Sequence, residues 1–414
     1  MSHARITAVT SVIKNGAGKV PGLLAVLALV PDPRRPRGRR FPLVFVLAVA
    51  AACTLAGAKT FREIGDQAAD LPQKVLRDLG GKPHPLRRKV IAPSETRIRT
   101  LLHLIDTEIL DEITGGWLRD LAAAGRLDGL LTAIAIDGKW LRGVLDGQVK
   151  LFAAMLHEEK AVIAQHRIPD ETTETTQVKE LLENVDLDGA VVTADAVNAQ
   201  RDTADYIAGP EQDGGRGSAY FPFVKGNQPK LQRAVFGALQ RDCPRDPDYT
   251  ELDCGHGRII RRSLWAAGAG DGIDFPHVRQ VARIRRDGYD ASGALISKEI
   301  VHAVTSLDED QASAADLAKL ARGQWGIESV HWLRDTAYGE DANTGYAGNG
   351  PQAMATLPGI SPSACSIFPA SPRSPAPSRP SHATETESST TCRYETQGSN
   401  DFGDPVDFKW ARFY

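Results

Sequence analysis

The sequence predicts a mixed α/β protein, with a helical region before the sheet and a disordered tail after it. Residues 130–228 alternate short apolar runs with helical patterns, in the order β-β-β-α-β-α-β. Residues 61–127 instead show helical spacing interrupted by turn signals. After Leu357 the chain is rich in Pro, Ser and Thr, and such a segment cannot bury enough apolar surface to fold.

The composition excludes several classes of protein. The chain has 414 residues and is 42% hydrophobic, which allows a real core and rules out a collagenous or fully disordered protein. The five cysteines are scattered without a CxxC pair, so we expect no zinc site or disulfide framework, and a reducing cytoplasm fits best. The net charge is only −3, so any binding to nucleic acid must depend on local basic patches.

Residues 1–127 are expected to form a helical N-terminal domain. Within it, residues 41–58 are uncharged and apolar, and they just meet the minimum length of a membrane-spanning helix. This stretch contains Pro42 and Gly57, is rich in small residues and is followed by no second span. A buried helix is therefore the better interpretation, and we expect no membrane association.

Two further helical patterns follow, in residues 61–80 and 92–113, and Ser94 is the expected N-cap of the second. Basic clusters lie at residues 34–40 and 87–89. These clusters are either solvated loop charge or contacts to phosphates, and together with the carboxylates described below they favour phosphate contacts.

Residues 128–356 are expected to form the sheet domain. The expected strands are residues 130–138, 149–157, 161–168, 189–197 and 219–228, and the expected helices between them are residues 171–185 and 198–208. Residues 243–305 alternate strand-like runs with Gly/Asp turns, which predicts a β-rich insertion. A long helix is expected from about Ala312.

Two predicted strands carry an aspartate near their carboxyl ends, Asp137 in AIAIDGKW and Asp195 in VVTADAVN. One such residue alone is most often a turn or capping aspartate. Two on successive core strands favour a shared site, because carboxylates that close apolar strands are costly unless paired, capped or metal-bound. Glu328 supplies a third acid from the long helix. Trp325 and Trp332 beside it would by default pack in the core, but a Glu next to tryptophans and flanked by His and Arg instead indicates an acid at the edge of a polar cleft.

Three carboxylates of this kind suit Mg²⁺ or Mn²⁺. Two such ions can activate a water or a 3′-hydroxyl and stabilise the leaving oxygen of a phosphodiester. Zinc is disfavoured because no Cys/His cluster accompanies the acids, and a serine or cysteine triad is disfavoured because the chain has no GxSxG motif.

Five motifs occur in one order along the chain: IDGKWLRG, VVTADAVNAQR, FVKGNQPKL, GHGRIIRRS and RGQWGIESVHWLRDTAYGEDAN. Together they resemble the DDE transposases of bacterial insertion sequences, and in particular the branch of the H-repeat-associated proteins. The resemblance runs from about Leu23 to Met354 and includes that branch's associated N-terminal domain. It implies an RNase H-like catalytic core whose catalytic and metal-binding residues are Asp137, Asp195 and Glu328.

The resemblance also implies contacts with DNA. The side chains concerned are Lys225, Asn227, Gln228, Arg258, Arg322 and His331, with His256 in the same HGR element as Arg258. For the KGNQ residues, a strand-to-helix turn is an equally good interpretation. Many relatives in the wider superfamily carry a Lys seven residues after the catalytic Glu, where this chain has Asp335. That departure bears on the DNA contacts and not on the metal site.

These features predict a transposase that uses two Mg²⁺ or Mn²⁺ ions to cleave DNA and transfer strands at the ends of its insertion sequence. The expected partners are double-stranded DNA, as terminal inverted repeats and as target, and further copies of the chain in a homo-oligomer. The expected location is the bacterial cytoplasm, at the nucleoid. Two alternatives remain, a nuclease of the same core that does not join ends and a non-catalytic DNA-binding remnant.

Residues 357–414 depart from the family, which would continue into an apolar helix that packs on the core. Pro358 follows Leu357 directly, and repeated prolines after it predict the end of any helix. The tail is either a natural disordered extension or, as we favour, a frameshifted reading that has replaced a lost helix. In the second case reduced stability or inactivity is expected.

Overall fold

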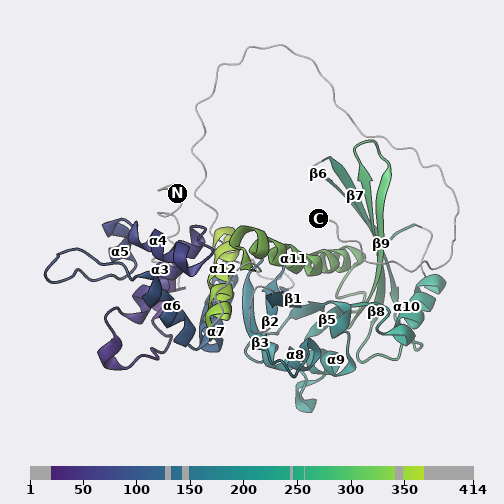
Figure 1. Cartoon of the computed structure of the whole chain (residues 1–414). Coiled ribbons are helices and arrows are strands. Elements are labelled where there is room, and N and C mark those ends of the chain that lie inside the picture. The colour runs from purple at the N-terminus through teal and green to yellow at the C-terminus, as the bar shows by residue number, and fades with distance from the viewer. Residues whose placement is uncertain are drawn as a thin grey trace, which may run out of the picture. The chain divides into compact units, whose positions relative to one another are not determined.

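The computed structural model describes residues 20–125, 132–141, 149–242, 246–255, 257–340 and 348–367. All of them lie within one unit of the chain, residues 1–370. They form a helical N-terminal region and a large mixed sheet that carries helices on both faces (Figure 1). The expected mixed α/β class is confirmed.

The helices of the N-terminal region bury one apolar cluster. They are α2 (Leu23–Leu27), α3 (Leu43–Leu55), α4 (Phe61–Ala69), α5 (Gln73–Asp78), α6 (Glu95–Leu104) and α7 (Thr107–Gly125), with a 3-10 turn at Pro36–Gly38. The apolar stretch at residues 41–58 contains α3, which is almost wholly buried in this cluster. Among the described helices, none combines the length and the apolar character that crossing a membrane requires. Ser94 takes the N-cap position of α6, although its side chain makes no capping hydrogen bond.

The described strands form a single sheet in the order β3-β2-β1-β4-β5-β9-β8-β7-β6. They are β1 (Thr132–Leu141), β2 (Val149–Leu156), β3 (Val162–Ile168), β4 (Ala190–Ala194), β5 (Ala219–Val224), β6 (Tyr249–Gly255), β7 (Arg258–Gly268), β8 (Gln280–Asp290) and β9 (Leu295–Thr305). β1, β4 and β5 run parallel, and the other neighbouring pairs are antiparallel. The parallel strands are nearly continuous apolar runs because helices cover both of their faces.

Helices on opposite faces of the sheet determine which way each residue of β1 points. α8 (Glu174–Leu182), α9 (Arg201–Ala208) and α10 (Pro229–Asp242) share an apolar cluster with Ile134 and Ile136. α11 (Ala314–Tyr338) packs on the other face, where Ile327 and Val330 contact Ala135. Because side chains alternate along a strand, Asp137 faces α11 with Ala135, and Gly138 faces α8 with Ile136.

Within residues 243–305, where a β-rich insertion is expected, residues 249–305 form β6 to β9. These strands continue the central sheet beyond β5 instead of building a separate sheet. α10 packs on β7, β8 and β9 and was not among the expected elements. Its apolar residues Leu231, Val235 and Leu239 nevertheless have helical spacing, and they are buried against the sheet.

The prediction that Pro358 ends the last helix is wrong. α12 spans Gly350–Ile367 and passes through both Pro358 and Pro362. A proline inside a helix removes one backbone hydrogen bond and introduces a clash with the preceding turn, but it does not abolish a helix that packing already holds. The first turns of α12 are held in this way, because Ala353, Met354 and Leu357 are buried in the N-terminal cluster. The expected disordered tail from residue 368 onward lies outside the described residues.

Candidate active site

Asp137 and Asp195 lie side by side on neighbouring parallel strands. The register of β1 and β4 pairs Ile136 with Ala194, and an aspartate follows each of them, Asp137 within β1 and Asp195 directly after β4. Asp195 has extended backbone and begins a short 3-10 turn as the chain leaves the sheet. The structure therefore brings these two predicted site residues together.

Glu328 reaches the same region from α11. Gln324, one turn earlier on this helix, donates to the carbonyl oxygen of Ile136 at 3.3 Å and accepts a hydrogen bond from Thr193 Oγ1 at 2.5 Å. These bonds attach α11 to β1 and β4 immediately before the two aspartates. Glu328 then lies close enough to Asp137 for its charge to raise the pKa of that carboxyl, so all three predicted acids meet in one region.

The acids at this site disfavour one another's charged forms. Burial is the main cause that raises the pKa of Asp137 to about 8. Three neighbouring carboxylates, those of Glu174, Asp195 and Glu328, raise it further. Burial also raises the pKa of Glu328; the charge of Asp195 adds to this shift and that of Lys225 opposes it. The site thus concentrates negative charge in a partly buried place.

Two of the residues predicted to contact DNA touch the aspartates directly. Lys225 Nζ donates to Asp195 Oδ1 at 3.0 Å, and both side chains are partly exposed. His331 Nδ1 lies 3.5 Å from Asp137 Oδ2. Burial, together with two nearby cations, lowers the pKa of His331 to about 3. At neutral pH this imidazole is uncharged and does not balance the negative charge of the site.

Asn227 and Gln228 brace the loop that follows Asp195. Asn227 Nδ2 donates to the carbonyl oxygen of Ala196 at 2.6 Å. Gln228 Nε2 donates to the carbonyl oxygen of Ala199 at 3.0 Å. Both amides thus hold Asp195 in place through the backbone, and their contact with DNA stays a prediction.

The remaining predicted DNA contacts lie toward β6 and β7. Arg322 forms ion pairs with Glu251 at 3.4 Å and with Asp253 at 3.2 Å. Arg258 is exposed at the start of β7. His256 lies outside the described residues. These arginines are therefore associated with the strands that extend the sheet, whereas Lys225 and His331 contact the aspartates themselves.

One acid near the site was missed by sequence reasoning. Glu174, in the first turn of α8, is one of the carboxylates that raise the pKa of Asp137. It belongs to the run ETTETT, in which nothing distinguishes it from Glu171. Trp332, for which core packing is only the default interpretation, is 55% exposed. Trp325 does pack inward, with its ring 5.5 Å from that of Phe223.

These side chains have the chemistry of a site for a hard divalent cation. Carboxylate oxygens are the ligands that Mg²⁺ and Mn²⁺ prefer, and the mutual repulsion of the acids is what a cation would relieve. As they are placed, no three His, Cys, Asp or Glu side chains of the described residues are close enough together to hold a metal ion. The chemistry of these donors thus suits a divalent cation, whereas their placement does not form a metal site among the described residues.

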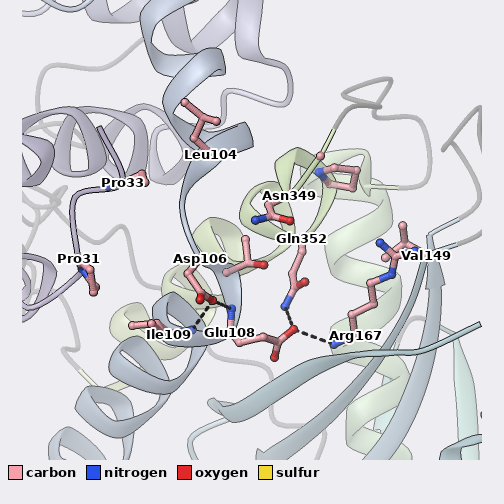
Figure 2. A pocket seen from close by; sticks show the side chains of 13 residues that line it. Pro31, Pro33, Leu104, Asp106, Glu108, Ile109, Val149, Arg167, Asn349 and Gln352 are labelled. Carbon is pink, nitrogen blue, oxygen red and sulfur yellow. Dashed lines mark hydrogen bonds between the residues drawn. The ribbon is translucent and has the colours of Figure 1, made fainter. Parts of the chain in front are cut away.

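A cavity of about 490 Å³ lies elsewhere in the molecule. Figure 2 shows Glu108 and Gln352 at this cavity, where Gln352 Nε2 donates to Glu108 Oε1 at 2.9 Å. It is lined by α7, α12, β2 and β3 together with residues near Pro31, and it contains none of the predicted site residues. The cavity and the carboxylate cluster are thus separate features.

The fold and the acids define a class, a mixed α/β protein whose carboxylates gather where the central strand β4 ends beside its parallel neighbour β1. Comparison with known proteins identifies the family. The profile described as Transposase DDE domain matches residues 132–357, more than half of the chain, so the protein belongs to that family. The profile described as DDE_Tnp_1-associated matches residues 24–118.

Individual relatives agree with this assignment at low identity. The chain is 26% identical over 362 residues to "Putative transposase YncI" of Escherichia coli O157:H7, covering 82% of this chain and 85% of the relative. It is 25% identical over 339 residues to "H repeat-associated putative transposase YhhI" of Escherichia coli K12, covering 77% of this chain and 83% of the relative. The resemblance to transposases, including the H-repeat-associated branch, is confirmed.

Proposed function

We propose that the protein is a transposase that cleaves DNA and transfers strands at the ends of its own insertion sequence. The core would be RNase H-like, with Asp137, Asp195 and Glu328 as its catalytic carboxylates. One observation carries the proposal: acids from β1, from the end of β4 and from α11 converge so closely that the other two raise the pKa of Asp137. Membership of the transposase DDE domain family supports it independently.

In this mechanism the three carboxylates would hold two Mg²⁺ or Mn²⁺ ions. Those ions, when bound, would activate water or a 3′-hydroxyl for attack on a phosphodiester and stabilise the leaving oxygen. The protein itself holds the three carboxylates in position. The bonds of Gln324 to β1 and β4 set the position of α11 and so of Glu328. Lys225 balances the charge of Asp195 and would lie beside the DNA backbone.

The partner would be double-stranded DNA, both as terminal inverted repeats and as target. Arg258 and Arg322 would approach it from the extended part of the sheet, and the exposed arginines among residues 34–40 would add phosphate contacts from the N-terminal region. Bringing two DNA ends together would require a homo-oligomer. Such an enzyme would act on DNA at the nucleoid, in the bacterial cytoplasm.

We further propose three functional parts. Residues 1–127 would bind DNA, residues 128–356 would carry the catalytic centre, and residues 357–414 would be a tail outside the family pattern. The two family profiles, at residues 24–118 and 132–357, support the first two parts. The third rests on the Pro/Ser/Thr-rich composition alone.

The test is an assay that separates cleavage from joining. The DNA that flanks the gene is searched for inverted repeats, and labelled duplexes of those ends are incubated with the purified chain and Mg²⁺. Cleaved ends and products joined to a target plasmid support a transposase. Cleavage without joined products indicates a nuclease, and binding without cleavage indicates a non-catalytic remnant; either outcome overturns the proposal.

A further inference from the structure

The loop between α5 and α6 places an exposed leucine among positive charges. Residues 82–90 have the sequence KPHPLRRKV, with four cations and no acid. The cations are all exposed: Lys82, Arg87, Arg88 and Lys89. Leu86 lies between them and is 89% exposed, more than any other large apolar residue that the structure describes. Water is a poor environment for this side chain, and the cations on either side of it attract an anionic partner.

The base of this loop is fixed to the core of the N-terminal region. Val90 is buried in the apolar cluster of that region, and its backbone pairs with Pro83 in an isolated β-bridge. The side chain of Gln73 on α5 brackets the backbone of Val90. Val90 N donates to Gln73 Oε1 at 2.8 Å, and Gln73 Nε2 donates to the carbonyl oxygen of Val90 at 3.0 Å. Because the loop is ordered in the free chain, a partner does not have to supply the free energy of ordering it.

The tip of the loop is shaped by one histidine and one strained residue. His84 Nδ1 accepts hydrogen bonds from the backbone N–H groups of Leu86 at 3.3 Å and Arg87 at 3.4 Å. The backbone of His84 also accepts from Arg88 N and donates to the carbonyl oxygen of Lys89, both at 2.8 Å. Arg88 has a φ of 50°, in the left-handed region that residues other than glycine seldom adopt. Such strain persists only where the surrounding structure fixes it, and it is concentrated at functional sites.

The size and chemistry of this tip fit the minor groove of duplex DNA. That groove is about 6 Å wide and takes a narrow loop, whereas the major groove, about 12 Å wide, takes a whole helix. The negative potential of the minor groove attracts arginine and lysine. Apolar side chains of proteins that bind there enter between base pairs and kink the duplex. Phosphate contacts alone would need only the cations, so Leu86 is the residue that favours insertion.

We propose that loop 82–90 enters the minor groove of DNA and that Leu86 wedges between two base pairs there. The inference rests on the proposed function, since it names how the N-terminal region contacts the DNA of the insertion sequence. The competing role is contact with an anionic membrane surface, to which basic and apolar side chains also bind together.

The experiment measures unstacking and bending of duplexes of the inverted repeats, bound to the full chain in EDTA so that no cleavage occurs. Permanganate oxidises unstacked thymines, and energy transfer between dyes at the two duplex ends reports the bend. Leu86→Ala removes the wedge. Leu29→Ala shortens another leucine of the same region, 69% exposed, and is the matched control. We expect the wild type and Leu29→Ala to bend the duplex by about 20–90° and to expose thymines, and Leu86→Ala to lose both effects.

Two further measurements separate the wedge from charge and from stability. Arg87→Gln combined with Lys89→Gln should reduce the slope of log affinity against log salt by up to about two, because each phosphate contact contributes about 0.9. Leu86→Ala should leave that slope unchanged, since it removes no charge. It should also leave the urea unfolding midpoint unchanged, because Leu86 is exposed.

The remaining outcomes count against the inference in different ways. If the wild type binds the repeats but leaves them straight and stacked, or if Leu86→Ala bends them as the wild type does, the wedge fails and the proposed function stands. An equal loss of bending in Leu29→Ala would overturn the wedge in the same way. If the wild type neither binds the repeats nor cleaves them with Mg²⁺, the proposed function fails as well. Sedimentation with vesicles of phosphatidylserine and phosphatidylcholine that depends on Leu86, without any unstacking of DNA, would assign the loop to a membrane surface instead.

Discussion

Lys139 and Asp335 form an ion pair between β1 and α11, with the buried Lys139 Nζ 2.5 Å from Oδ1 of the partly exposed Asp335. Lys139 follows Asp137 by two residues, and Asp335 follows Glu328 by seven. The same ammonium also donates to Glu340 Oε2 at 2.7 Å. This pair therefore joins the strand that carries one predicted catalytic acid to the helix that carries another.

Replacing Lys139 should be costly for both stability and activity. In Lys139→Met the buried Glu340 keeps its contact with Arg334 but loses the ammonium, and α11 loses one of its links to β1. Removing one partner of a buried ion pair typically costs about 3–5 kcal/mol. We expect a loss of that order in urea unfolding, together with weaker DNA cleavage. Lys74→Met is the control, because Lys74 makes an exposed i,i+4 pair with Asp78, worth less than ~1 kcal/mol. Equal effects of the two changes would contradict the structural role of Lys139.

Replacing the three predicted acids should separate cleavage from DNA binding. Asp137→Asn, Asp195→Asn and Glu328→Gln each remove a carboxylate charge and keep the side-chain volume. We expect each to lower the rate of Mg²⁺-dependent cleavage by at least about 100-fold and to leave affinity for the DNA ends within about threefold, since metal ligation and not phosphate contact is lost. Cleavage rates and gel-shift affinities on the same duplex check this. A variant that still cleaves at the wild-type rate would remove its residue from the catalytic set.

The parts of the site that sequence reasoning found are those with a local signal. Asp137 and Asp195 each close an apolar run, and the parallel register that places them side by side follows from neighbouring central strands. Glu328 needed the resemblance as well, because an acid on an amphipathic helix has no local mark of function. The mixed α/β class was accessible for the same reason, since strand and helix periodicities are local.

The parts that were missed depend on contacts between distant residues. Lys139 and Asp335 are 196 residues apart in sequence, and Gln324 and Ile136 are 188 apart. Nothing local distinguishes Glu174 from the other acid at this helix start. Its carboxylate lies against Gly138, a contact that only the fold creates. α12 passes through Pro358 because tertiary packing outweighs a local helix-breaking signal.

DNA binding should fall steeply with salt despite the net charge of −3. Among the basic residues near the start of the chain, Arg34 is paired with Asp32 at 2.9 Å. Arg35, Arg37 and Arg40 are exposed and are the better candidates for phosphate contacts. Changing these three to Gln should reduce the slope of log affinity against log salt by up to about three, because each phosphate contact contributes about 0.9.

A matched change tests whether that effect is specific. Arg62, Arg77 and Arg97 are exposed on helices of the same region, so replacing them alters the net charge by the same amount. Filter-binding measurements between 50 and 300 mM salt, about the range in which the slope is linear, compare the two triple variants. Equal slopes for the two would mean that the cluster at residues 35–40 makes no particular contact with DNA.

Truncation should distinguish α12 from the residues beyond it. Ending the chain at Ile367 keeps Met354 and Leu357, which pack in the N-terminal cluster, and should leave the unfolding midpoint unchanged. Ending it at Asn349 removes these side chains together with Thr356, which donates to Asp111 at 2.6 Å. We expect that truncation to cost several kcal/mol, since burying one such side chain is worth about 1.5–3 kcal/mol. Loss of folding in the chain that ends at Ile367 would assign a structural role to residues 368–414.

The contribution of Asp111 to the stability of the protein should decline between about pH 4 and pH 7. Burial raises the pKa of this carboxyl to about 7, although hydrogen bonds from Thr356 and Gln352 oppose the shift. A folded-state pKa above the unfolded value means that the folded chain binds more protons, so the stability that Asp111 contributes is fully present at low pH and is lost as pH rises toward 7.

In Asp111→Asn the titration of this carboxyl is absent. The unfolding free energy of the wild type relative to this variant should therefore fall by more than about 1.4 kcal/mol, the equivalent of one pKa unit, between pH 5 and pH 8. Asp120→Asn, which changes an exposed acid of the same helix, should follow the wild type. Urea unfolding at the two pH values measures all three chains, and a constant difference between the wild type and Asp111→Asn would show that Asp111 is already charged at pH 5.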